Sequence, residues 1–237
     1  LCFREQEGIR YRLRWIFSWN RELLGKMLRI AVPNGVESGL FQFVKVALSS
    51  VTALFGTYQI AANGIAQSIW SVAALISSSM GPVFITVIGQ CMGAGDDRQA
   101  ERYFWRLLRL TLILSAVWNG AILAAAPLFL RWFDVSSEAK RCVFWLVLIH
   151  NLANALIFPF ADPLGKGLRA AGDVGFTMGV SLFTTIVVRL VFSVVFAISL
   201  GLGVMGIALA MCLDWLIRGI LFWIRLRGGK WKSCRVI

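Results

Sequence analysis

Ionisable and amide side chains recur inside long apolar segments of this chain, at spacings that place them on single helix faces. The first stripe, at intervals of three, four and four residues, consists of Asn34, Glu37, Phe41 and Lys45. Polar and ionisable groups inside a membrane helix are costly, which makes them candidate functional groups. Pro33 removes a backbone donor and can kink the helix, leaving carbonyl oxygens free near Glu37. The pattern predicts a proton or cation site at Glu37 and Asn34, unless Glu37 meets water or pairs with a lysine.

Two further stripes repeat every four residues. One consists of Gln59, Asn63, Gln67 and Ser71, and the other of His150, Asn154, Phe158 and Asp162. The first stripe either lines a cavity or donates hydrogen bonds to neighbouring helices. In the second, Asp162 precedes Pro163 and is either a second cation ligand or a loop cap. His150 is the only histidine, and it is either a structural hydrogen-bond partner or a proton relay.

Charged residues also lie within the last two apolar segments. Arg189 sits near the middle of the fifth, where its guanidinium stays protonated and needs a carboxylate partner. Its candidate partners are Glu37, Asp162 and Asp214. Asp214 and Arg218 are four residues apart on the sixth segment, and this spacing predicts a structural ion pair between them.

Six apolar segments carry these side chains, and each is about as long as a bilayer is thick. They are Leu28–Leu54, Ile60–Met92, Leu107–Phe133, Val143–Ala161, Phe176–Leu200 and Val204–Ile224. About 20 apolar residues span a hydrocarbon core of ~30 Å as a helix. Backbone groups in lipid must be satisfied within the segment. We therefore predict an all-α polytopic membrane protein with six transmembrane helices.

Composition and charge agree with a membrane protein. The chain is 58% hydrophobic and 15% charged, with a mean hydropathy of +0.74. Most of its 24 Lys and Arg residues precede the first segment or follow the second, fourth and sixth. Arg131, Lys140 and Arg141 lie on the other side. This is the positive-inside bias. It predicts cytoplasmic termini in a cell membrane, and it assigns the net charge of +12 to topology and anionic lipid contacts rather than to nucleic acid.

Motifs of catalysis and cofactor binding are not indicated. The run Gly201–Gly206 fits GxGxxG, but it follows a membrane helix rather than a strand, so the dinucleotide reading fails. The five cysteines have no metal-binding spacing. We therefore expect neither an enzyme nor a bound cofactor or metal. The expected domains are a cytoplasmic linker with an interfacial helix (1–29), a six-helix lobe (30–226) and a basic tail (227–237), and the abrupt start suggests one half of a longer chain.

Several runs resemble, in order and spacing, the second lobe of multidrug and toxic compound extrusion (MATE) transporters. These runs are LRIAVPNGVE (28–37), AANGI (61–65), VIGQCMGAGD (87–96), GLRAAGD (167–173) and GVMGIA (203–208). The resemblance covers nearly the whole chain. It implies that this chain is the C-terminal lobe of a two-lobe bundle, with its N-terminal lobe as the missing partner.

The resemblance also implies a function. MATE transporters export organic, often cationic, compounds in exchange for Na⁺ or H⁺, by alternating access. In some branches acids on the lobe's first and fourth helices bind the coupling cation, which points to Glu37 and Asp162, whereas in others the acid lies in the first lobe. Substrate and cavity would be contacted by Phe41, Lys45, Asn63, Gln67, Asn154 and Arg189. Two alternatives are a lipid-linked oligosaccharide flippase, with Arg189 and Lys45 lining a cationic cavity, and a partner lobe without transport.

Overall fold

The computed structural model describes residues 21–132 and 136–234 of the chain, which are helical throughout apart from short turns and contain no strand. Most of the predicted linker and the last residues of the predicted tail lie outside these ranges. The principal helices are α1 (Arg21–Ala53), α2 (Thr57–Ala73), α3 (Leu75–Gly93), α4 (Asp97–Trp132), α5 (Ser137–Leu156), α6 (Phe158–Ala161), α7 (Pro163–Ala170), α8 (Val174–Phe183) and α10 (Val204–Arg227).

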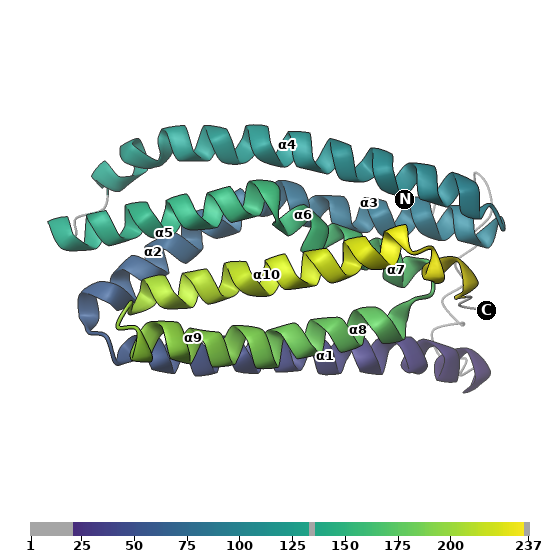
Figure 1. Ribbon diagram of the computed structural model, residues 1–237, viewed down its shortest axis with the longest axis horizontal. Helices are drawn as coiled ribbons and strands as arrows, with labels where there is room; N and C mark the ends of the chain where they lie inside the picture. The colour runs from purple at the N-terminus through teal and green to yellow at the C-terminus, as the bar shows by residue number, and fades with distance from the viewer. Residues whose placement is uncertain (1–20, 133–135, 235–237) are drawn as a thin grey trace, which may run out of the picture.

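The helices form an elongated bundle along one axis (Figure 1). The helix α1 lies along one edge and α4 along the opposite edge, with α10 between them. The turns α3–α4 and α7–α8 and the end of α10 gather at one end of the bundle, whereas α1–α2 and α9–α10 turn at the other. The basic residues Arg98, Arg169 and Arg227 flank the turns of the first end, as the charge bias predicts.

The helical stretches coincide with the six predicted apolar segments. Four stretches among the described residues are long and apolar enough to cross a membrane, and a bent pair makes a fifth if it is one span. They are Leu75–Gly93, Asp97–Phe129, Val174–Ser199 and Val204–Arg227, with Ser137–Leu156 and Phe158–Ala170 as the bent pair. The long helix α1 covers the remaining segment, and Glu37, Gln42 and Lys45 make it less apolar. The described chain is thus an all-α polytopic membrane protein.

Breaks in the helices only partly follow the prolines. The helix α1 runs through Pro33 without interruption. The fourth segment bends by 56° between Ser137–Leu156 and Phe158–Ala170, next to Pro159, which withholds a backbone donor. The second segment breaks at Ala74, between α2 and α3, although neither glycine nor proline stands there. The bend at Ile157 has the larger consequence, since it redirects the residues from Phe158 to Ala170.

The fifth segment is largely π-helical beyond α8. Two wide turns, η2 (Thr184–Val191) and η3 (Val195–Ser199), flank the single turn α9 (Phe192–Val194). π-Helical turns are rare in proteins, and those that occur are often found at functional sites. The first of them carries Arg189.

The turn between η3 and α10 packs closely enough to require a glycine. A Cβ atom at Gly206 would lie 2.5 Å from the carbonyl carbon of Phe196 and 2.6 Å from the backbone nitrogen of Ala197. Backbone atoms cannot move aside as the end of a flexible side chain can. We predict that Gly206→Ala lowers the free energy of unfolding by about 1–3 kcal/mol, because it overpacks this contact.

Thermal unfolding of the purified protein in detergent measures this effect. Gly120→Ala is the matched control, because Gly120 is also helical and a Cβ there meets nothing within 4 Å. Equal melting temperatures for the two variants would contradict the close packing of α10 on η3.

Candidate functional site

A polar cavity of about 250 Å³ lies inside the bundle. It is formed between α1, α2, α5, η2 and α10, toward the end where α1 stops and α2 and α10 begin. Its lining consists of Lys45, Leu48, Ser49, Thr52, Asn63, Gln67, His150, Arg189, Ile207, Ala208 and Met211. Two of these side chains are permanently cationic and none is acidic. The lining therefore combines positive charge, amide groups and apolar side chains.

Arg189 belongs both to the cavity lining and to a charge cluster with Asp214 and Arg218. Asp214 is fully buried and accepts a hydrogen bond of 2.8 Å from Arg218 Nη2. Arg218 also donates to the hydroxyls of Thr184 and Thr185. Arg189 Nη1 lies 3.9 Å from the second carboxylate oxygen of Asp214, so this carboxylate faces two guanidinium groups.

Arg189 itself is held loosely. Its side chain is 8% exposed, and it forms no hydrogen bond with any side chain in the described part of the chain. Its guanidinium carbon lies 5.1 Å from the centre of the Phe41 ring, a cation–π distance. Arg189 thus retains hydrogen-bonding capacity, and it borders the cavity.

Glu37 on α1 forms an ion pair with Arg169 on α7. Arg169 Nη2, at the end of α7, lies 2.7 Å from Oε1 and 2.6 Å from Oε2 of Glu37. Arg169 also donates to Thr177 and Ser181 on α8. The Glu37 side chain is 18% exposed. One carboxylate therefore connects α1 to both α7 and α8.

Asp162 lies apart from both Glu37 and the cavity lining. It stands at the turn between α6 and α7, and Lys166 Nζ lies 2.7 Å from its Oδ2. The side chain of Asn34 lies outside the described residues. Glu37 pairs with Arg169 and Asp162 with Lys166, so the two candidate ligands have separate basic partners.

In each predicted stripe, some residues line the cavity and others do not. Asn63 and Gln67 line the cavity, whereas Gln59 accepts a hydrogen bond from the backbone nitrogen of Val204 and so satisfies the start of α10. In the other stripe His150 lines the cavity, while Asn154 is fully buried away from it, with Ser115 donating to its backbone carbonyl. Cavity lining and packing thus occur on the same helix.

Phe158, which belongs to the His150 stripe, packs on two tryptophan rings. Phe158 lies 4.9 Å from Trp215 and 6.3 Å from Trp70, between ring centres, and Trp70 stacks on Trp215 at 5.9 Å. These rings form a core cluster with Met211 and Ala161. Phe41, the aromatic residue expected to contact substrate, lies against the guanidinium of Arg189.

Several residues of the site were not predicted. Arg169 was not identified as a site residue, because no periodicity relates it to Glu37, 132 residues earlier. Ser49 and Thr52 continue the Lys45 face of α1 at intervals of four and three, a signal that the sequence does contain. No group of three or more His, Cys, Asp or Glu residues in the described ranges could hold a metal ion.

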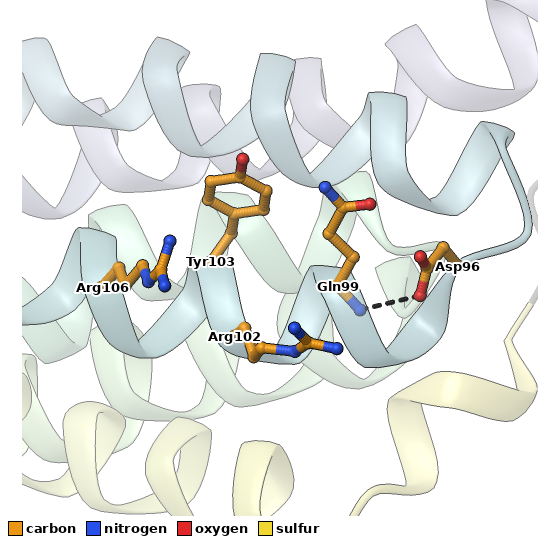
Figure 2. A pocket seen from close by; sticks show the side chains of 5 residues that line it. All are labelled: Asp96, Gln99, Arg102, Tyr103 and Arg106. Carbon is orange, nitrogen blue, oxygen red and sulfur yellow. Dashed lines mark hydrogen bonds between the residues drawn. The ribbon is translucent and has the colours of Figure 1, made fainter.

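A second hollow, of about 290 Å³, lies on the surface at the start of α4. Figure 2 shows its lining, Asp96, Gln99, Arg102, Tyr103 and Arg106. Asp96 accepts a hydrogen bond of 2.9 Å from the backbone nitrogen of Gln99 and so caps α4. Successive turns of one helix make this recess, and its arginines are exposed. It is a basic surface at the end of the bundle rather than an enclosed site.

Comparison with known proteins gives one family and a consistent fold. The family model MatE matches residues 33–195. The uncharacterized transporter YisQ of Bacillus subtilis is 22% identical over 232 residues, which cover 94% of this chain and 49% of that protein. The probable multidrug resistance protein NorM of Listeria innocua is 27% identical over 169 residues, covering 68% and 34%. The chain thus spans about half the length of these relatives or less.

Solved structures share the same architecture. A MATE crystal structure in the straight conformation superposes with a TM-score of 0.81 at 19% identity, covering 95% of this chain and 51% of that one. A MOP superfamily transporter from Pyrococcus furiosus superposes with a TM-score of 0.78 at 21% identity, covering 85% and 44%. That transporter is described by the words "reverse polarity of binding pocket suggests different function".

The charge cluster predicts an order of stability among variants. Asp214→Asn leaves the guanidinium groups of Arg189 and Arg218 without an anion in the interior, at a cost of roughly 3–5 kcal/mol. Arg189→Gln leaves the 2.8 Å pair of Asp214 and Arg218 intact. We therefore expect the second variant to be much more stable.

Thermal unfolding in detergent, with the yield of folded protein, gives the comparison. Arg141→Gln, at an exposed position outside the cluster, controls for the loss of a positive charge. An Arg189→Gln variant as unstable as Asp214→Asn would show that Arg189 is needed to compensate Asp214.

Proposed function

Since the chain belongs to the MatE family of membrane transporters, we propose that it forms one half of a secondary transporter that exports organic compounds. Export is driven by exchange for Na⁺ or H⁺, and the two halves alternate between inward-open and outward-open packings. The chain spans about half of the relatives it matches, which supports an N-terminal half as the required partner. The bilayer is the other partner.

The proposed coupling group is Glu37. A carboxylate within a membrane helix can bind a proton or Na⁺, and either one neutralises it. Neutralisation removes the charge that holds Arg169 at 2.6–2.7 Å. Because Arg169 belongs to α7 and also contacts α8, loss of this pair weakens the attachment of α1 to these two helices, while α1 remains packed on α2 and η2. The Glu37–Arg169 contact is the observation that carries the proposal.

Cation binding at Glu37 shifts a conformational equilibrium between a state with the Glu37–Arg169 pair and a state without it. A ligand changes a conformational equilibrium only by its different affinity for the two conformations. The cation binds Glu37 well only when Arg169 is displaced, since both occupy the same oxygens. Cation binding and the paired state therefore exclude each other, as exchange requires.

The organic substrate is proposed to contact the polar cavity, through Lys45, Asn63, Gln67 and Arg189. The family resemblance suggests organic cations. Yet the carboxylates Glu37, Asp162 and Asp214 each face a basic side chain, so a cation-binding carboxylate must be released from its pair or lie in the other half.

A flippase for lipid-linked oligosaccharides is the second candidate. It requires Lys45 and Arg189 to line one cavity, and both do so. The cavity in this half holds a head group and not a whole lipid-linked molecule. The remainder would extend toward the other half or the bilayer.

The proposed location is a cell membrane, with both chain ends in the cytoplasm. Basic residues at the end of the bundle that holds the α3–α4 and α7–α8 turns support this orientation (Figure 1). Positive loops are retained on the cytoplasmic side during insertion. The polar cavity, near the opposite end, then lies toward the outer leaflet.

Replacement of Glu37 tests the coupling. In the full-length transporter, we predict that Glu37→Gln abolishes export driven by a Na⁺ or H⁺ gradient, because a carboxamide binds neither cation in place of the carboxylate. Efflux of a fluorescent organic compound from cells with an imposed gradient, at matched expression, measures this. The expected rate falls at least tenfold, toward that of cells without the transporter.

Glu138→Gln is the matched control, because Glu138 is an exposed acid in the first turn of α5, and this variant should export normally. Gradient-driven export retained by Glu37→Gln would move the coupling group to the other half. Loss of export in both variants would trace the effect to expression or insertion.

A further inference from the structure

The lining of the polar cavity carries two basic side chains, Lys45 and Arg189, and no acid among the described residues. Asp214 is engaged by Arg218 at 2.8 Å and approaches Arg189 only to 3.9 Å. No ion pair of the described residues involves Lys45. Arg189 is buried, where a charge that is not fully compensated is costly, whereas Lys45 is exposed in this half. An anion in the cavity would offset this cost.

Hydrogen-bonding capacity in the cavity is also unused. His150 is 1% exposed, and neither ring nitrogen has a partner among the described residues. Arg189 is similarly buried and its Nε is unpartnered. Both side chains border the cavity. Buried polar groups nearly always find partners, so two of them facing one cavity indicate a ligand.

The hydrogen-bond donors in the cavity favour a ligand with negative charge. Lys45 and Arg189 can only donate, and the amides of Asn63 and Gln67 add further N–H groups. The hydroxyl protons of Ser49 and Thr52 are used on the carbonyls of Lys45 and Leu48. Carboxylates, which a cationic ligand needs, are absent from the lining. Leu48, Ile207 and Met211 supply an apolar wall beside the donors.

From these contacts we infer that the cavity binds the acidic head group of an amphipathic organic substrate, between Lys45 and Arg189. The head group is a carboxylate, sulfonate or phosphate, and the apolar wall receives the carbons next to it. This inference rests on the proposed transport function and names the substrate class. A volume of about 250 Å³ fits a head group and a few carbons, and the rest of the substrate extends toward the other half.

Binding to the purified full-length transporter in detergent tests the inference. The probes are two fluorescent compounds with the same aromatic body, one ending in a carboxylate and the other in a trimethylammonium group. We expect tighter binding of the carboxylate probe. Lys45→Gln should weaken it about tenfold, as loss of one charge-assisted hydrogen bond does, and should leave the ammonium probe unaffected or bound more tightly.

Two further variants separate charge from folding. Lys45→Arg keeps the cation and should retain binding of the carboxylate probe to within a few fold. Arg141→Gln removes a positive charge at an exposed position outside the cavity and should bind as the parent does. An equal or stronger affinity for the ammonium probe, unchanged by Lys45→Gln, would overturn the inference.

Competition identifies the source of the anion. Displacement of the probe by an alkyl phosphate or a lipid-linked pyrophosphate, but not by inorganic phosphate at equal concentration, supports an amphipathic substrate. Displacement by inorganic phosphate as effectively as by the alkyl phosphate would overturn the substrate assignment and leave a small-anion site.

Failure of the inference and failure of the transport proposal are distinguishable. A protein that exports the ammonium probe along a gradient but does not bind the carboxylate probe contradicts the inference alone. A protein that binds the carboxylate probe with the expected Lys45 dependence, yet exports neither probe under any gradient, contradicts the proposed function.

Discussion

The cost of charge inside a membrane governs the interior of this half-bundle. Each acidic side chain at the site lies against a basic one: Glu37 against Arg169, Asp162 against Lys166, and Asp214 against Arg218. Breaking such a pair by removing one member leaves an unpaired charge, which is far more costly than removing both. The pairs Asp162–Lys166 and Asp214–Arg218 are local, four residues apart, whereas Glu37 and Arg169 connect α1 with α7. Of these three pairs, Glu37–Arg169 is therefore the one that joins distant helices.

Beyond these pairs, two further basic side chains determine the character of the cavity. Lys45 and Arg189 line a space without an acid, at the end of the bundle where α1 stops. The wide turn η2 carries Arg189, and Phe41 covers the guanidinium from α1. A change at Glu37 that moves α1 would move Phe41 and Lys45 with it, because all three residues lie on one helix. This shared helix is the physical route by which ion binding at Glu37 and substrate binding at the cavity can influence each other.

The helical architecture could be predicted from the sequence, because membrane-length apolar runs leave the backbone few alternatives. The 3.6-residue period likewise placed Asp214 and Arg218 together, and Lys45, Asn63 and Gln67 do line a cavity. Contacts that depend on how helices break and bend were beyond the pattern. The stripe from His150 to Asp162 is interrupted at Ile157, and beyond this break Phe158 packs on tryptophans. Similarly, Arg169 follows a bend of 56° between Ser137–Leu156 and Phe158–Ala170. Pro159 marks the place of that bend, but no spacing in the sequence gives its angle or pairs Arg169 with Glu37.

Charge exchange between Glu37 and Arg169 tests most directly whether this one pair holds α1 to the bundle. The measurement is the melting temperature of the full-length transporter in detergent, for Glu37→Arg, Arg169→Glu and the double variant. If the pair acts as described, each single variant is destabilised by about 3 kcal/mol or more, because two like charges meet inside the bundle. The double variant then recovers a large part of the lost stability. A double variant no more stable than the sum of the two losses would contradict a direct role of this pair in holding α1.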